Sequence, residues 1–88
     1  MEKIVDTPVE SAYLLDLIRP IVTNFADARV ERKVDEKGVL LTLTVDQNDM
    51  GRIIGKGGET ARSIRHLLRQ MGMQNQAHVA LKINEPVR

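Results

Sequence analysis

The sequence contains no cysteine among its 88 residues, so disulfides, thiolate metal sites and thiol catalysis are excluded. No apolar run approaches the roughly 20 residues that a membrane-spanning helix needs. The first six residues are acidic on balance and lack the long apolar core of a signal peptide. We therefore expect a cytoplasmic protein with no membrane partner.

Aromatic side chains are almost absent, because Tyr13 and Phe25 are the only two. Neither falls in a predicted strand, which argues against folds that stack nucleic-acid bases on sheet aromatics, such as the RRM and OB folds. The two histidines, His66 and His78, have neither a metal-ligand spacing nor a nucleophile close in sequence. We expect both to be solvated surface residues, and we expect no catalytic site, metal or cofactor.

The net charge of +1 conceals an uneven distribution of charge along the chain. Residues 1–51 contain 6 Lys/Arg and 10 Asp/Glu, whereas residues 52–69 contain five basic residues and a single acid, Glu59. Phosphates are neutralised by local positive charge, not by a high overall isoelectric point. The second segment is therefore a candidate anion-binding region, although a solvated basic helix face would have the same composition.

Hydrophobic spacing predicts six elements in the order α-β-β-α-α-β. They are a helix over residues 7–24, strands over 28–34 and 39–45, helices over 48–54 and 58–71, and a strand over 77–83. Pro20 should kink or end the first helix near Ile18. Asn48 and Asp49 are candidate caps of the short helix, and Gly72 should end the long one.

The helix pair between the second and third strands is long enough for a crossover, so those strands can be parallel neighbours. We predict an α+β fold in which three helices cover one face of a three-stranded mixed sheet and the other face meets water. The long helix should bury the stripe Ala61, Ile64, Leu67, Leu68 and Met71. Residues 8–84 are expected to form one domain, with a flexible lead-in over 1–7 and a short tail over 85–88.

The segment Gly55-Lys56-Gly57-Gly58 is the most informative part of the chain. Three glycines in four positions cost backbone entropy and need a structural reason. Gly55 and Gly58 would let the chain reverse between two helices, and Gly57 would leave the backbone bare at the tip. The N-terminus of the following helix and the Lys56 ammonium would add positive charge, so the loop is a candidate phosphate site.

Further candidate residues flank this loop. Arg52 precedes it, and Arg62, Arg65 and Arg69 fall on one stripe of the following helix. An aliphatic groove should lie between the loop, the helices and the third strand. Its expected lining consists of Ile53, Ile54 and Ile64. We expect at least one of these three side chains to belong to the core instead.

The spacing does not match other glycine-rich phosphate loops. A P-loop has four residues between its first glycine and the Gly-Lys pair, followed by Ser or Thr. Here three residues separate Gly51 from Gly55, and Gly57 follows Lys56. A dinucleotide fingerprint requires glycine where Thr60 stands. A tight turn between two helices, without a ligand, is the structural alternative.

The residues Asp49–Arg52, the glycine loop and the residues Thr60–Arg65 together resemble a KH domain. The element order is that of the type II KH fold, and the resemblance extends from about Val9 to Ile83. The chain is most similar to the small stand-alone bacterial KH proteins of the KhpA family, because their Asp-Met-Gly motif, glycine loop and Thr-Ala pair are all present. Pro20, inside the first helix, is a departure from that pattern.

The resemblance implies binding of about four unpaired RNA nucleotides, with the glycine loop against the RNA backbone and the bases near Val79 to Leu81. The implied RNA-binding residues are Arg52, Ile53, Ile54, Gly55, Lys56, Gly57, Gly58, Thr60, Ala61, Arg62, Ile64 and Arg65. It also implies a homodimer, a larger KH-containing partner of the KhpB type, and a role as an RNA chaperone or post-transcriptional regulator. The alternative is a protein-interaction or dimerisation module whose groove binds a protein partner.

Overall fold

A computed structural model describes residues 9–74 and 76–84 of the chain. Its helices and strands are α1 (Val9–Ile18), β1 (Arg29–Asp35), β2 (Gly38–Thr44), α2 (Met50–Ile54), α3 (Glu59–Gln74) and β3 (Val79–Asn84). Three short 3-10 turns, η1 (Phe25–Asp27), η2 (Gln47–Asp49) and η3 (Lys56–Gly58), lie between them. The predicted α-β-β-α-α-β order is confirmed. The expected lead-in over 1–7, the predicted helix start at residue 7 and the tail over 85–88 lie outside the described residues.

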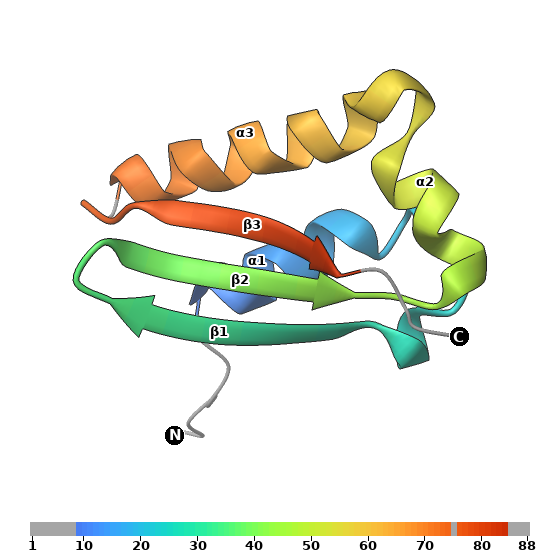
Figure 1. Cartoon of the computed structure of the whole chain (residues 1–88), viewed down its shortest axis with the longest axis horizontal. Helices are drawn as coiled ribbons and strands as arrows, with labels where there is room; N and C mark the ends of the chain where they lie inside the picture. Colours follow the sequence, from blue (N-terminus) through green and yellow to red (C-terminus); the bar gives the residue numbers. More distant parts are fainter. Residues whose placement is uncertain (1–8, 75, 85–88) are drawn as a thin grey trace.

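The three strands form one mixed sheet in the order β1-β2-β3. β1 and β2 are antiparallel, with register pairs from Arg29↔Thr44 to Asp35↔Gly38. β2 and β3 are parallel, as predicted for strands joined by a helical crossover. The helices lie on one side of the sheet, and α3 runs alongside β3 (Figure 1). The predicted α+β fold, with three helices on one face of a mixed sheet, is therefore confirmed.

The core lies between the helices and the inner face of the sheet. Alternate residues of β2 and its continuation supply the sheet side of this core: Val39, Leu41, Leu43 and Val45. The helices contribute the buried residues Leu14, Ile18, Ile53, Ile64 and Leu68. Burial of these aliphatic side chains is the main favourable term for a domain of this size.

The first helix ends at Ile18, so its predicted continuation to Asn24 is wrong. Pro20 has no backbone N–H and its ring clashes with the carbonyl four residues earlier, which prevents further helical turns. The N–H groups of Ile21 and Val22 both donate to the Ile18 carbonyl, at 2.8 and 3.1 Å, and close the helix end. The helix stop that Pro20 predicted near Ile18 is confirmed.

The long helix α3 continues to Gln74, so the predicted stop at Gly72 is wrong. Gly72 instead permits close packing, because a Cβ there would lie 2.7 Å from Val79 Cγ2 and 2.9 Å from the Ala77 carbonyl oxygen. The stripe predicted to be buried also includes one error. Leu67 is 41% exposed, whereas Ala61, Ile64 and Leu68 are buried.

Candidate functional site

The glycine loop joins α2 to α3 through a tight turn that only glycine adopts easily. The N–H of Gly55 donates to the Gly51 carbonyl at 2.8 Å and ends α2, and the N–H of Gly58 donates to the Gly55 carbonyl at 3.1 Å. Gly55, Gly57 and Gly58 all have positive φ, at 77°, 63° and 77°. Side chains with a Cβ rarely occupy this region, so the backbone conformation itself explains the three glycines.

Gly55 also has a steric requirement that its neighbours in the loop do not share. A Cβ at Gly55 would collide with the Thr60 side chain and would lie 2.8 Å from the Thr60 backbone nitrogen. Thr60, a predicted RNA-binding residue, is thus placed against the back of the loop. Its side chain supports the shape of the loop from within.

The tip of the loop is open. Nothing lies within 4 Å of a Cβ built at Gly57 or at Gly58. Lys56 is exposed beside them, and Arg62 Nη2 lies 3.4 Å from the Gly57 carbonyl oxygen. Bare backbone, an ammonium and a guanidinium therefore meet at the N-terminus of α3, a combination suited to an anion.

Several of the predicted RNA-binding residues belong to the interior. Ile53 is fully buried at 0% exposure, and Ala61 and Ile64 are also buried. The expectation that at least one lining isoleucine is a core residue is therefore confirmed. The Ile53 side chain belongs to the core in the free chain, and its role in RNA contact stays a prediction. Ile54, on the next position of α2, is half-buried.

A groove runs between α3 and β3, but its lining differs from the predicted aliphatic one. It is lined by Arg65, Arg69, His78, Val79, Ala80 and Leu81. Two guanidinium groups and an imidazole therefore border a strand whose Val79 and Leu81 side chains are buried. None of the three predicted isoleucines is among the residues that line this groove, and Ile53 and Ile64 are buried in the core.

The edge of β3 that faces this groove is free of strand partners among the described residues. The Val39 N–H donates to the His78 carbonyl at 2.8 Å. The backbone N–H and C=O groups of His78 and Ala80 therefore point toward β2. The backbone groups of Val79 and Leu81 consequently point toward the groove. Arg65 agrees with this geometry, because its Nε lies 3.4 Å from the Leu81 carbonyl oxygen.

Asp49, at the start of α2, is a buried carboxylate that ties two segments together. Its Oδ1 accepts hydrogen bonds from the Thr23 N–H at 3.0 Å and the Thr23 hydroxyl at 2.8 Å, and its Oδ2 accepts from the Asn24 N–H at 2.9 Å. The hydrogen bonds from the backbone of Thr23 and Asn24 lower the pKa of Asp49 below its ordinary value of 3.8, while burial opposes this shift. Arg52 adds a smaller charge effect in the same direction as the hydrogen bonds.

The predicted capping role of Asp49 is therefore wrong. Its side chain makes no cap hydrogen bond to α2. Asp46 instead caps the preceding 3-10 turn η2, because its carboxylate accepts from the Asn48 N–H at 3.3 Å. No signal in the sequence distinguished the two acids, since the partners of Asp49 lie 25 and 26 residues earlier in the chain.

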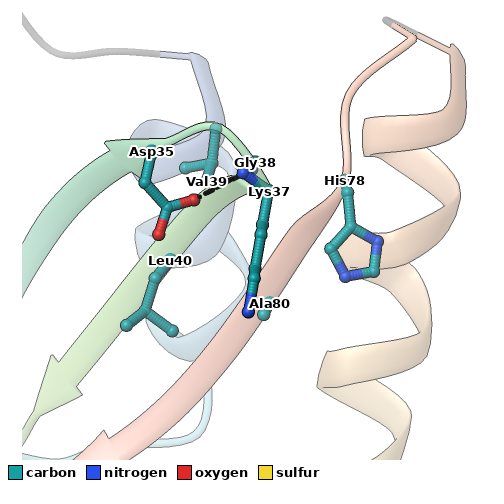
Figure 2. Close-up of a pocket in the computed structure, with 7 residues that line it drawn as sticks. All are labelled: Asp35, Lys37, Gly38, Val39, Leu40, His78 and Ala80. Carbon is teal, nitrogen blue, oxygen red and sulfur yellow. Dashed lines mark hydrogen bonds between the residues drawn. The ribbon is translucent and has the colours of Figure 1, made fainter.

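A second hollow lies where β1 turns into β2, and it shares His78 and Ala80 with the groove (Figure 2). The Asp35 carboxylate accepts hydrogen bonds from the backbone N–H groups of Lys37 and Gly38, at 2.8 and 3.2 Å. Gly38 has φ +138°, and a Cβ there would collide with the His78 carbonyl oxygen. This hollow is explained by the closure of the hairpin against the start of β3.

Neither a metal cluster nor a membrane span occurs in the described part of the chain. In residues 9–74 and 76–84 there is no group of three or more His, Cys, Asp or Glu side chains placed to hold a metal ion. None of the described helices is long and apolar enough to cross a membrane.

Comparison with known proteins identifies the family. The family model described as "KhpA/KhpB, KH domain" matches residues 11–83. The chain belongs to this KH-domain family. The protein named RNA-binding protein KhpA of Listeria monocytogenes is 32% identical over 72 residues, which cover 82% of this chain and 95% of that protein. Proteins of the same name are 33% identical in Bacillus subtilis, over 80% of this chain and 86% of theirs, and 38% identical in Borreliella burgdorferi, over 78% and 89%.

This KH domain brings the predicted site residues together only in part. The loop residues Gly55–Gly58 and the exposed side chain of Arg62 lie together at the N-terminus of α3, and Arg52 is exposed on α2, three residues before the loop. Arg65 lies along the groove instead, next to Arg69 and His78. The groove position of His78 was missed, because an isolated histidine at the start of a strand carries no spacing signal.

Proposed function

We propose that this chain binds single-stranded RNA along α3, with the RNA backbone against the loop Gly55–Gly58 and the bases in the groove beside β3. The open backbone at Gly57 and Gly58 is the observation that carries the proposal. It allows a phosphate to approach closely at a place where side chains would prevent it in other loops. The relatives that carry the name RNA-binding protein support the same ligand.

The phosphate contacts follow from the charges around the loop. The Lys56 ammonium and the positive end of the α3 dipole attract an incoming phosphate, and Arg52 and Arg62 flank it. The helix rises about 1.5 Å per residue, so Arg69 lies about 16 Å along α3 from Gly58. That length suits the short stretch of about four nucleotides that a KH domain holds.

Base recognition would use the free edge of β3. The backbone groups of Val79 and Leu81 point toward the groove and can pair with base edges, as an added strand would pair with them. Arg65 lies at the Leu81 carbonyl and would have to move or to share this acceptor when RNA binds. Contacts of this kind tolerate several bases, so we expect loosely selective binding.

The cellular role that fits this site is an RNA chaperone or post-transcriptional regulator in the cytoplasm, without a catalytic step or a cofactor. One KH domain offers few contacts, so affinity would increase when sites are combined. A homodimer and a larger KH-containing partner of the KhpB type are the proposed means of combining them.

A second candidate function is a protein-interaction module. The exposed Leu67 supports it, because this side chain lies beside a hollow lined by Arg62, Ser63 and His66 on the surface of α3. Arg62 borders both this hollow and the glycine loop, so the two candidate functions share this residue of α3.

The test combines Lys56→Asp with Gly57→Asp and measures affinity for a short unpaired oligonucleotide. Gly57 lies at an open position with φ 63°, which aspartate tolerates better than most residues, so the fold should persist. Two carboxylates in the place of a phosphate should weaken binding by at least about tenfold. Circular dichroism should remain that of the wild-type protein.

The matched comparison is Lys56→Asp alone against Lys37→Asp. Both substitutions reverse the charge of one exposed lysine in a turn. Lys37, however, lies in the β1–β2 hairpin, at the end of the sheet opposite to the glycine loop (Figure 1). Lys56→Asp should weaken RNA binding and Lys37→Asp should change it little. Wild-type affinity in the double loop variant would refute the proposed site and leave the protein-interaction function.

A further inference from the structure

β1 is an open edge of the sheet. It occupies one end of the strand order, and its outer edge has no strand partner among the described residues. Six of its seven residues are exposed. An edge strand of this length presents a row of unpaired backbone N–H and C=O groups to any strand that can pair with it.

The sequence of β1 is complementary to itself. It reads Arg-Val-Glu-Arg-Lys-Val-Asp from Arg29 to Asp35, and reversal about Arg32 exchanges basic for acidic residues. When two copies of β1 lie antiparallel with Arg32 opposite Arg32, each remaining pair is complementary. The pairs are Arg29 with Asp35, Val30 with Val34, and Glu31 with Lys33.

We propose that the homodimer put forward under the proposed function, on which this inference rests, pairs two copies of this chain through the outer edges of β1, antiparallel and about a two-fold axis at Arg32. The two three-stranded sheets then continue as one sheet of six strands. The occupant of the edge is a second copy of the same chain, because charge complementarity of β1 with itself selects it.

The pairing keeps each side chain on its proper face. In the register with β2, Val30, Arg32 and Val34 lie opposite Leu43, Leu41 and Val39, on the helix-covered side. Arg29, Glu31 and Lys33 lie opposite Thr44, Thr42 and Leu40, on the outer side. In the dimer the two valine pairs therefore form on the inner face, where Val34 is 60% exposed in the single chain. The charge pairs form on the outer face.

Charge also fixes the register. A shift of the second copy by two residues in one direction places Glu31 opposite Glu31, and a shift in the other direction places Lys33 opposite Lys33. Like charges directly opposite each other destabilise a strand pair. A shift by one residue would place outer-face side chains opposite inner-face ones. Charges on an edge strand discourage indiscriminate pairing. Here they disfavour the neighbouring registers, and a shift by four residues would pair only three residues of each strand instead of seven.

Arg32 is the one position where like charges meet at the axis. Its Nε lies 3.2 Å from Glu10 Oε1 of α1. Each copy thus brings its own counter-ion for Arg32, which reduces the repulsion across the axis. The contact is short and is made mainly by backbone hydrogen bonds, so it falls below the size of a standard stable interface and the dimer should be weak.

The test is a charge exchange between Glu31 and Lys33, with sedimentation equilibrium measured up to about 1 mM protein. Glu31→Lys or Lys33→Glu alone creates two like-charge pairs across the axis, and each should weaken dimerisation by at least about tenfold. The double variant restores both attractive pairs and should dimerise within about threefold of the wild type. Thr42 and Leu40 face these positions across β2 and are uncharged, so the fold should tolerate all three variants.

A cysteine scan reports the register directly, because the chain has no cysteine of its own. Arg32→Cys should form an interchain disulfide under mild oxidation, since residue 32 meets itself at the axis. Lys33→Cys should not, because its two copies are offset along the strands and exceed the distance of about 7 Å that a disulfide spans.

Three results would overturn the proposal. They are a chain that remains monomeric up to about 1 mM, a double charge variant that dimerises no better than the single ones, and equal cross-linking at positions 32 and 33. A dimer that survives the β1 variants and is lost in Leu67→Glu would also overturn it, and would assign self-association to the α3 surface.

Discussion

At the scale of single residues, Asp49 shows how the glycine loop is held in place. Its carboxylate joins the segment after α1 to the start of α2, and α2 leads directly into Gly55. The Asp49 side chain has 0% exposure, and both of its oxygens accept hydrogen bonds, three in all. Removal of any of these donors leaves a buried carboxylate oxygen with one partner fewer, which lowers the stability of the fold.

We predict that Asp49→Asn changes the acid stability of the protein. The pKa of Asp49 is lowered in the folded state, so its contribution is fully present above the ordinary value of 3.8 and is lost as the pH falls through the lower folded value. The substituted asparagine would not titrate, and its amide group would face the Asn24 N–H without accepting from it. Urea unfolding at several pH values between about 2 and 6 should give a variant less stable at the upper end, with a flatter decline toward the acid end.

Thr23→Val is the matched control for this prediction. It removes the hydroxyl donor and keeps the backbone N–H groups of Thr23 and Asn24, so the pKa of Asp49 should rise only part of the way. Its acid dependence should fall between those of the wild type and Asp49→Asn. An Asp49→Asn variant with the wild-type pH dependence would show that another carboxylate is responsible.

At the scale of elements, two helical glycines have opposite roles. Gly72 is buried where α3 meets β3, and a Cβ there would lie 2.7 Å from Val79 Cγ2. Gly51 lies in α2, is exposed, and has nothing within 4 Å of a built Cβ. Helix propensity favours alanine over glycine equally at both positions, so the difference between them is packing alone.

We predict that Gly72→Ala destabilises the protein by about 1–3 kcal/mol, because overpacking outweighs the propensity gain. Gly51→Ala should stabilise it by about 0.5–1 kcal/mol, because it reduces the freedom of the unfolded chain and meets no neighbour. Chemical denaturation of the two variants beside the wild type measures both effects. A stabilised Gly72→Ala would mean that α3 does not pack against β3 as closely as described.

The element order and the sheet were predictable because the signals are local. Alternation over 39–45 and the crossover length decided the strands, and Pro20 decided the end of α1. The errors arose where tertiary packing overrides a local rule. Gly72 resembles a helix stop but serves the contact with Val79, and Leu67 has the spacing of a core residue although no described segment covers it.

The candidate site was predictable to the same limited extent. Glycine spacing located the loop, and its positive φ values follow from composition. The position of Ile53 in the core, the groove beside Arg69 and His78, and the partners of Asp49 all depend on which segments meet in space. No local sequence pattern indicates which distant segments come into contact.

At the scale of the whole molecule, the two proposed surfaces lie at opposite edges of the sheet. The RNA groove borders β3 and the proposed dimer contact uses β1. In a six-stranded sheet the two copies of β3 would stand five strand spacings apart, about 24 Å. A single RNA strand that reaches both grooves would gain from effective concentration, which would compensate for the few contacts of one domain.

The most direct test of RNA binding is an NMR titration of the protein with a short unpaired RNA. We expect the largest saturable shifts at the amides of Gly55–Gly58, with further shifts at Val79 and Leu81 on the edge of β3. The amide signals of Glu36 and Lys37 in the hairpin turn should not shift. Saturable shifts confined to the outer sheet face or to the surface around Leu67, with the glycine loop unchanged, would contradict the proposed site.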